Sequence, residues 1–162
     1  GNIAGKIVLD LGCGTGIIAI GAAFLGALKV YAFDSDEEAL IVAKSNYEKI
    51  KKEHKMGVIV FLQRDVGEVN QHGFTVIMNP PFGVQKKGAD RVFLDRATHL
   101  ANVIYSIHKF ESKNFIESFV HERRFKSKFL GERSLPLKAT MHFHEDRRYP
   151  VRIGLWKFEK TA

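Results

Sequence analysis

Cysteine and proline are scarce in this chain, whose 162 residues include one cysteine and four prolines. The single Cys13 has no partner for an intrachain disulfide, which excludes a disulfide-stapled secreted fold and fits a reducing compartment such as the cytosol. Because 45% of the residues are hydrophobic, the chain can bury a sizeable core, which excludes a disordered or fibrous segment. We expect one domain over residues 1–162.

The chain also lacks a convincing membrane segment. Leu11 to Leu28 is uncharged and long enough to span a bilayer, but five glycines interrupt it. A strand, a turn and a helix explain the same residues better, and we predict no membrane association.

Acidic residues are the minority, with 18 Asp and Glu against 25 Lys and Arg, for a formal charge of +7. The excess lies mostly in the second half of the chain. A positive field of this kind attracts polyanions and favours encounters with nucleic acid, although solvated basic surfaces are also common.

Short apolar runs alternate with amphipathic stretches in the first half. Strands are expected at Lys6–Leu11, Lys29–Asp34, Gly57–Leu62 and Phe74–Met78, with helices at Gly16–Leu25 and Asp36–His54. The second helix is expected to face the core with Ala39, Leu40, Val42, Ala43, Tyr47 and Ile50. Apolar strands without alternation are typical of a parallel sheet covered on both faces, so the pattern predicts an α/β fold.

The second half is expected to continue this pattern and then depart from it. We predict a loop at Gly83–Gly88, helices at Ala89–Leu100 and Ser112–Arg124, and a strand at Asn102–Ile107. Two further strands, Lys126–Arg133 and Tyr149–Phe158, are expected to form an antiparallel hairpin that closes a mostly parallel sheet.

A glycine-rich loop follows the first strand. Its residues are Asp10, Gly12, Cys13, Gly14 and Gly16, in the order G-x-G-x-G with the acid two positions before the first glycine. The glycines permit a sharp turn and close approach to a ligand. A dinucleotide fingerprint would read G-x-G-x-x-G, and Asp10 would repel a pyrophosphate but can serve an ammonium group, directly or through water. The loop therefore predicts a nucleotide-like cofactor with a cationic amino-acid tail.

Three further residues are candidates for cofactor binding. Asp34 ends the second strand, 24 positions after Asp10, where a carboxylate can accept both hydroxyl protons of a ribose. Ser35 and Asp36 are better placed to cap the following helix. Asp65 is a weaker candidate for the amino group of an adenine, with the backbone of Val66 beside it, and a surface-turn aspartate is the alternative.

The motif Asn79-Pro80-Pro81-Phe82 follows the fourth strand, at the edge where open α/β sheets bind ligands. We expect this motif to bind the exocyclic amine of an aromatic ring such as a nucleic-acid base. Such an amine is a poor nucleophile because its lone pair is delocalised into the ring. The Asn79 side-chain oxygen and the Pro80 carbonyl can accept the two amine hydrogens, and proline restricts the backbone on both sides. Phe82 can stack on the base, so these four residues are the predicted catalytic motif, with Asn79 also adjoining the cofactor.

These motifs together resemble the methyltransferase-like 5 family of ribosomal RNA adenine methyltransferases. The similarity is carried by VLDLGCGTG from Val8, FDSDEEAL from Phe33, VIMNPPFG from Val76 and VIYSIHK from Val103, and by residues 86–90 and 93–94. The resemblance implies a Rossmann-like class I methyltransferase fold with seven strands and S-adenosylmethionine as cofactor. It also implies N6-methylation of an adenosine in small-subunit rRNA.

The same resemblance implies a partner and a missing part. The partner would be a small zinc-binding methyltransferase activator that pairs with the exposed edge of the third strand. Relatives carry a segment before the first strand that helps to enclose the cofactor, so we expect this sequence to lack one.

Several residues are secondary candidates. Lys86 and Lys87 follow the predicted catalytic motif, and His108 and Lys109 end the fifth strand, so all four are candidate RNA contacts. The histidines of residues 142–146 resemble a metal cluster, but alternation on a hairpin explains them, and we predict no metal site.

Other functions fit the same motifs. An N2-guanine rRNA methyltransferase or a protein glutamine N-methyltransferase would use the same acceptor geometry. A degenerate methyltransferase fold serving as an RNA-binding scaffold is the non-enzymatic alternative, and a nicotinamide-dependent dehydrogenase is the third.

Overall fold

The computed structural model describes residues 1–81, 88–137 and 149–161. Its described strands are β1 Ile7–Leu11, β2 Lys29–Asp34, β3 Val58–Gln63, β4 Thr75–Met78, β5 Val103–Lys109, β6 Phe125–Leu137 and β7 Tyr149–Lys160. The described helices are α1 Ile17–Phe24, α2 Glu37–Lys51, α3 Ala89–Leu100 and α4 Lys113–Glu122, with 3-10 turns η1 Val66–Glu68 and η2 Phe110–Ser112. None of the helices in these ranges is long and apolar enough to cross a membrane.

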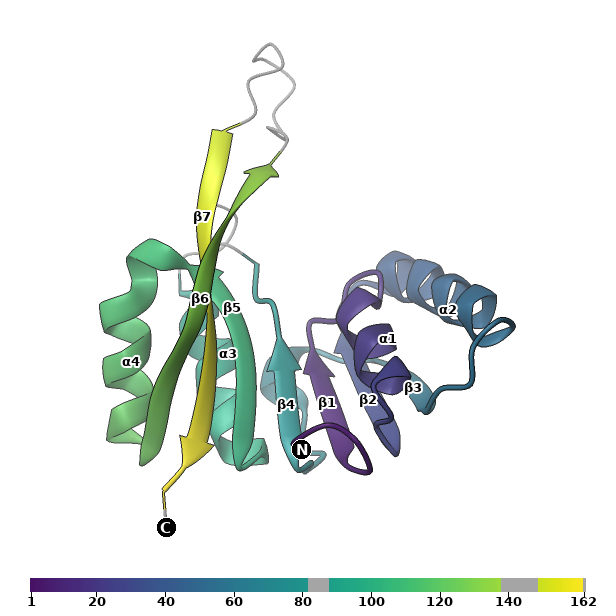
Figure 1. The fold of residues 1–162 in the computed structure, drawn as a ribbon, viewed down its shortest axis with the longest axis horizontal. Coiled ribbons are helices and arrows are strands. Elements are labelled where there is room, and N and C mark those ends of the chain that lie inside the picture. Colours follow the sequence, from purple (N-terminus) through teal and green to yellow (C-terminus); the bar gives the residue numbers. More distant parts are fainter. Residues whose placement is uncertain (82–87, 138–148, 162) are drawn as a thin grey trace.

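The described strands form one seven-stranded sheet in the order β3-β2-β1-β4-β5-β7-β6 (Figure 1). The first five strands in this order are parallel, and β7 pairs antiparallel with both β5 and β6. This confirms the predicted Rossmann-like α/β fold with a C-terminal antiparallel hairpin.

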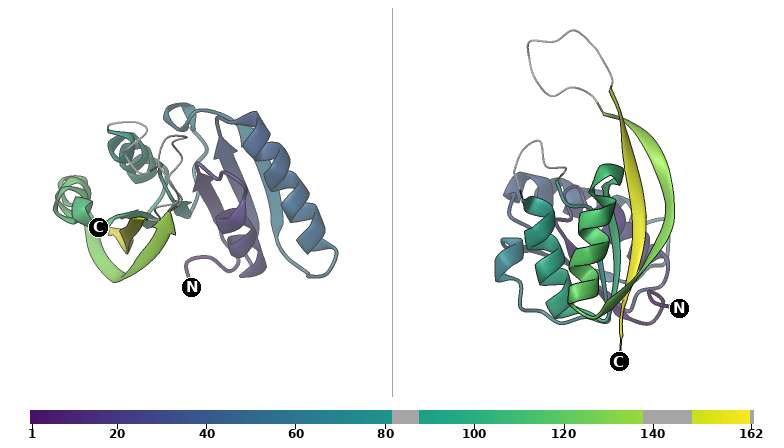
Figure 2. Two further views of the ribbon diagram at one scale, coloured as in Figure 1. Left: turned by 90° about the horizontal axis from the view of Figure 1, so that it is seen from above. Right: turned by 90° about the vertical axis from the view of Figure 1, so that its left-hand side faces the viewer.

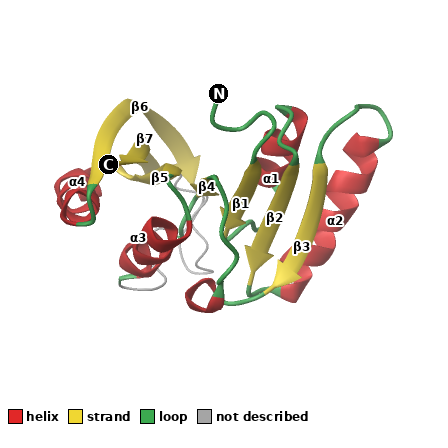
Figure 3. Cartoon of the chain, turned by 90° about the horizontal axis from the view of Figure 1, so that it is seen from below, coloured by secondary structure: helices red, strands yellow, loops and turns green. Residues whose placement is uncertain are grey.

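Successive strand residues point to opposite faces of the sheet, and helices cover both faces. On one face, Val8 and Val30 pack with α1 and α2. On the other, Leu9 and Met78 pack with α3 and α4 and with Trp156 of β7. Figures 2 and 3 show the two pairs of helices on opposite sides.

The sheet order places β1 beside the parallel strand β4. From β1 the chain continues to β2 on one side, and from β4 it continues to β5 on the other side. Residues Leu11 and Met78 are partners at the carboxyl ends of these strands. In open α/β sheets a ligand crevice forms at such a point. The glycine loop after β1 and the Asn79 motif after β4 therefore meet at one edge.

Some boundaries differ from the sequence prediction. Helix α2 ends at Lys51 instead of His54, and Val42 is 46% exposed, so its predicted place in the core is wrong. The inner stripe of α2 is narrower, with Leu40, Ala43 and Tyr47 buried. Strand β6 is longer than predicted because it pairs with β7 up to Leu137, through a bulge between Phe129 and Gly131.

Candidate functional site

The loop after β1 depends on glycine at three positions. Gly12, Gly14 and Gly16 have φ angles of 71°, 51° and 82°, in the left-handed region that favours glycine. A Cβ atom at Gly12 would lie 2.8 Å from Cε1 of Phe93, which belongs to α3. Gly16 is the N-cap of α1, so the loop leads directly into a helix N-terminus. A Cβ at Gly16 would lie 3.0 Å from that of Ala43, whereas Gly14 has open space around it, so at Gly14 only the backbone angle favours glycine.

Asp34 links this loop to β2. Its Oδ2 accepts a hydrogen bond from the Gly14 amide at 2.7 Å, and its Oδ1 accepts one from the Asp36 amide at 3.0 Å. A carboxylate oxygen can accept more than one hydrogen bond, so acceptor capacity remains on both oxygens. Capping of α2 falls to Asp36, which accepts from the Glu38 and Ala39 amides, as the sequence indicated. Asp34 is therefore held rigidly with its carboxylate in the cavity wall.

Asp10 lies beneath the glycine loop rather than in the cavity wall. Its side chain is fully buried, and neither carboxyl oxygen has a hydrogen-bond partner within the described part of the chain. Burial, together with the nearby charge of Asp34, raises the pKa of Asp10 to about 7. Direct contact between Asp10 and a ligand, one of the two predicted modes, is therefore contradicted in this conformation, because the carboxyl group does not reach the surface.

Cys13 is also buried, with 8% of its surface exposed. Burial and the charges of Asp10 and Asp34 raise the pKa of its thiol to about 12. The thiolate needed for a nucleophile is therefore disfavoured, and Cys13 serves as a small loop residue.

A cavity of about 420 Å³ opens at the carboxyl edge between these elements. It is lined by six residues of the sequence prediction, namely Gly12, Asp34, Asp65, Val66, Asn79 and Pro81. It is also lined by six that the prediction did not name as site residues, namely Phe33, Ser35, Arg64, Gly88, Val92 and Phe93. The glycine loop, η1, the end of β4 and the start of α3 thus converge on one space.

Asp65 and Val66 form the wall of this cavity at η1. The Asp65 side chain accepts a hydrogen bond from the Gly67 amide at 2.8 Å, which caps the short turn. Asp65 therefore combines the two readings left open by the sequence, since it is a turn aspartate and also lines the cavity.

The predicted catalytic motif begins directly after β4. Asn79 and Pro81 are exposed and line the cavity, whereas Pro80 is buried. Because the β4 residues before it are buried in the sheet, the backbone at Asn79 is fixed from one side. Phe82, Lys86 and Lys87 lie outside the described residues, as do residues 142–146.

His108 lies in the core rather than on the surface, where the predicted RNA contact would require it. Its side chain is fully buried, with Nε2 2.5 Å from Ser106 Oγ and Nδ1 3.0 Å from Asp90 Oδ1. The predicted direct contact with RNA is therefore contradicted, and the imidazole instead joins β5 to the first turn of α3. Lys109 is partly exposed at the same edge and stays a candidate.

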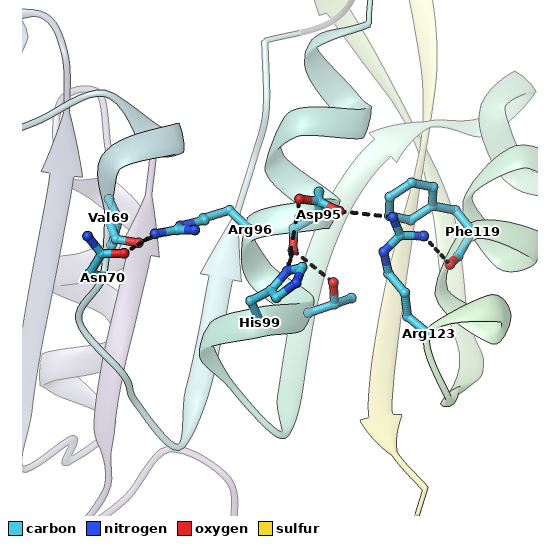
Figure 4. A network of polar contacts seen from close by, with 8 residues as sticks. Val69, Asn70, Asp95, Arg96, His99, Phe119 and Arg123 are labelled. Carbon is cyan, nitrogen blue, oxygen red and sulfur yellow. Dashed lines mark hydrogen bonds and ion pairs between the residues drawn. The ribbon is translucent and has the colours of Figure 1, made fainter.

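Helix α3 is held on two further sides (Figure 4). Arg96 donates to the Val69 carbonyl at 2.5 Å and to the Asn70 side chain, which ties α3 to the segment after η1. Arg123, the C-cap of α4, donates to Asp95 at 2.9 Å. Val66 of η1 and Phe93 of α3 both line the cavity. Arg96 therefore ties together the two elements that carry these residues.

The contribution of α3 to the cavity was not predicted, because Val92 and Phe93 read in the sequence as ordinary apolar positions of an amphipathic helix. A usable signal was the position of α3, which follows the catalytic motif closely and must start near the carboxyl edge.

Known proteins are similar to this chain in sequence and in fold. Residues 2–79 match the family model described as ribosomal protein L11 methyltransferase (PrmA). The rRNA N(6)-adenosine-methyltransferase METTL5 of Danio rerio is 34% identical over 166 residues, covering 99% of this chain and 78% of the relative.

Two solved structures illustrate the likeness of fold. PH1948 of Pyrococcus horikoshii aligns with a TM-score of 0.83 and 36% identity, over 99% of this chain and 77% of that chain. Magnesium protoporphyrin IX methyltransferase of Synechocystis PCC 6803, solved with bound SAM, aligns with a TM-score of 0.73 over 99% of this chain and 73% of that chain. At 19% identity, the second shows the shared fold alone.

Proposed function

Because this chain belongs to the METTL5 family of rRNA N(6)-adenosine-methyltransferases, we propose that it transfers a methyl group from S-adenosylmethionine to the N6 amine of an adenosine in small-subunit rRNA. The observation that carries this proposal is the position of Asn79, which follows β4 at the carboxyl edge and lines the same cavity as Gly12 and Asp34. A side chain that can accept a hydrogen bond from the substrate amine thus adjoins the proposed cofactor site.

The residues present fit S-adenosylmethionine. Asp34 offers carboxylate oxygens to a ribose, and Asp65 with the Val66 backbone offers partners to an adenine at η1. The carboxyl group of Asp10 is buried under the loop without a hydrogen-bond partner among the described residues, so it can serve an ammonium group through water, whose positive charge would favour the ionised carboxylate. When bound, this cofactor supplies an electrophilic methyl group on a sulfonium ion.

The chain's own contribution is to orient the substrate amine. The Asn79 side-chain oxygen and the Pro80 carbonyl accept the two N6 hydrogens, which turns the nitrogen lone pair towards the methyl group. The nitrogen lone pair would form the new N–C bond while the bond between sulfur and the methyl carbon breaks, its electron pair staying on sulfur as a neutral thioether. The nitrogen would then lose a proton to solvent. No strong base is required, because preorganised hydrogen-bond acceptors lower the barrier.

The choice of adenine in rRNA follows from the family and not from the amine geometry. Guanine N2 or a glutamine side chain would satisfy the same two acceptors. The L11 methyltransferase match stops at residue 79, whereas the similarity to METTL5 continues through the second half of the chain. That second half carries most of the basic residues, which favours an RNA substrate over a protein one.

We also propose that the protein is cytoplasmic. We further propose that a small zinc-binding activator pairs with the edge of β3. Strand β3 stands at one end of the sheet order, and Val58 on it is 53% exposed. Edge strands can pair with another chain. Val58→Asp is expected to abolish a complex with the activator on gel filtration. Leu130→Asp, in the opposite edge strand and 46% exposed, is the matched control and is expected to leave it intact.

The enzymatic proposal is tested by incubating the chain, with and without the activator, with labelled S-adenosylmethionine and either small ribosomal subunits or naked rRNA. Label that maps to one adenosine supports it. Label in ribosomal protein alone would assign the activity to the protein-methylating alternative, and cofactor binding without transfer to any substrate would support the scaffold.

A further inference from the structure

An aromatic–basic cluster lies beside the candidate site without being part of it. It consists of Phe110 in η2, Lys113 in α4, Phe129 in β6 and Arg152 in β7. The Phe110 and Phe129 rings are 5.9 Å apart, the Arg152 guanidinium lies 4.2 Å from the Phe110 ring centre, and the Lys113 ammonium lies 5.3 Å from that of Phe129. Four separate elements thus bring two rings and two cations together.

This cluster has a rigid base and an accessible top. The Phe129 ring lies 5.2 Å from that of Trp156, which is fully buried and whose Nε1 donates to Glu117 at 3.1 Å. In contrast, Phe129 is 36% exposed and the Arg152 side chain 52% exposed. Such an arrangement is a preorganised stacking platform rather than a closed core.

The cluster lies at the same edge of the sheet as the proposed catalytic motif. Phe110 directly follows the end of β5, and Asn79 directly follows the end of the neighbouring parallel strand β4. Beyond β5, the β6–β7 ribbon continues past this edge, as Figure 1 shows, and carries Arg152 and the exposed Arg133 with it. A nucleic acid that presents a base to Asn79 and runs along this edge towards β5 and β7 would bring its flanking nucleotides to the cluster.

We propose that the aromatic–basic cluster binds unpaired nucleotides that flank the target adenosine, with Phe110 and Phe129 stacking on bases and Lys113 and Arg152 contacting phosphates. Aromatic rings interleaved with Lys or Arg are the combination that binds single-stranded nucleic acid. This inference rests on the proposed RNA substrate and deepens it.

One carboxylate restrains the cluster in the free protein. Arg152 donates to Glu132 at 3.1 Å, and both side chains are about half exposed. A phosphate would compete with Glu132 for the guanidinium. Removing either partner breaks the ion pair, but the two changes have opposite effects on attraction for RNA. This asymmetry separates RNA binding from a purely structural ion pair.

The test uses the rRNA fragment that the wild-type chain methylates, and measures KM for RNA, KM for the cofactor and kcat. Arg152→Gln is expected to raise KM for RNA and to reduce the salt dependence of binding by about one counterion. Glu132→Gln is expected to lower KM for RNA. Phe129→Leu, which keeps apolar packing on Trp156, is expected to raise KM for RNA by about tenfold, since stacking is lost.

Two controls make the outcome decisive. Lys44→Gln removes an exposed cation from α2, at the far end of the sheet, and is expected to change nothing (Figure 1). Annealing a complementary strand to the flanking nucleotides is expected to remove the difference between wild type and Phe129→Leu. Equal weakening by Arg152→Gln and Glu132→Gln, or unchanged KM in Phe129→Leu, would overturn the inference while methylation by the wild type still supports the enzymatic proposal. Failure of the wild type to methylate any RNA would instead refute the proposed function itself.

Discussion

Asp10→Asn should stabilise the cofactor-free protein, and by more at high pH than at low pH. The Asp10 carboxyl group is fully buried without a partner among the described residues, and its pKa is raised from 3.8 to about 7. Between these values the unfolded chain is ionised at this position while the folded chain holds the proton. Each pH unit in that interval therefore costs the native state about 1.4 kcal/mol, and the loss levels off above pH 7.

The size of the effect follows from the two pKa values. Going from pH 5 to pH 8, the stability of the wild type should fall relative to Asp10→Asn by about 2 to 3 kcal/mol. The Asn amide adds an offset of its own, but that offset does not depend on pH. Urea unfolding of both proteins at a series of pH values gives the difference, and subtraction removes the other titrating groups.

A second variant tests the cause. The charge of Asp34 contributes to the raised pKa of Asp10, although less than burial does. In an Asp34→Asn background, the pH dependence should therefore level off at a lower pH. A stability difference between the wild type and Asp10→Asn that stays constant from pH 5 to pH 8 would refute the reasoning. It would mean that hydrogen bonds, for example from buried water, offset the desolvation of the Asp10 carboxylate, so that its pKa is not raised.

Four other outcomes are expected. Asn79→Ala should lower kcat by about 100-fold or more, as loss of a preorganised polar contact does, with cofactor affinity little changed in equilibrium binding. Asp34→Ala should instead weaken cofactor binding by about tenfold or more, measured by calorimetry, since charge-assisted hydrogen bonds are lost. His108→Ala should destabilise the fold by about 2 to 4 kcal/mol in urea unfolding, because Asp90 and buried Ser106 lose a partner, while RNA affinity per folded molecule is retained. Cys13 should resist alkylation at pH 8 until the protein is unfolded, because its thiol pKa is raised to about 12; rapid labelling of native protein would contradict this.

The order of elements and the edge at which the glycine loop and Asn79 meet were predictable from sequence, because each depends on local patterns. Runs such as Ile7–Leu11 are apolar at most positions, and glycines at Gly12, Gly14 and Gly16 mark a left-handed turn whatever surrounds them. The motif at Asn79 was placed correctly because parallel strands share one carboxyl edge.

Features that depend on tertiary packing were not predictable. Burial of His108 follows from Asp90, 18 residues earlier, and from Trp156 on a strand at the far end of the sequence, with rings 6.1 Å apart. The Phe93 contact beneath Gly12 likewise joins residues far apart in the chain. Val42 was predicted to be buried but is exposed. Helical periodicity alone does not say how wide a stripe of α2 the sheet will cover.

The central claim is that this chain methylates an adenine N6 through Asn79 and Pro80. The most direct measurement is nucleoside mass spectrometry of rRNA after incubation with the wild type or Asn79→Ala and a cofactor carrying a deuterated methyl group. We expect deuterated N6-methyladenosine with the wild type and almost none with the variant. Deuterium in N2-methylguanosine, or equal N6-methyladenosine from both proteins, would contradict the claim.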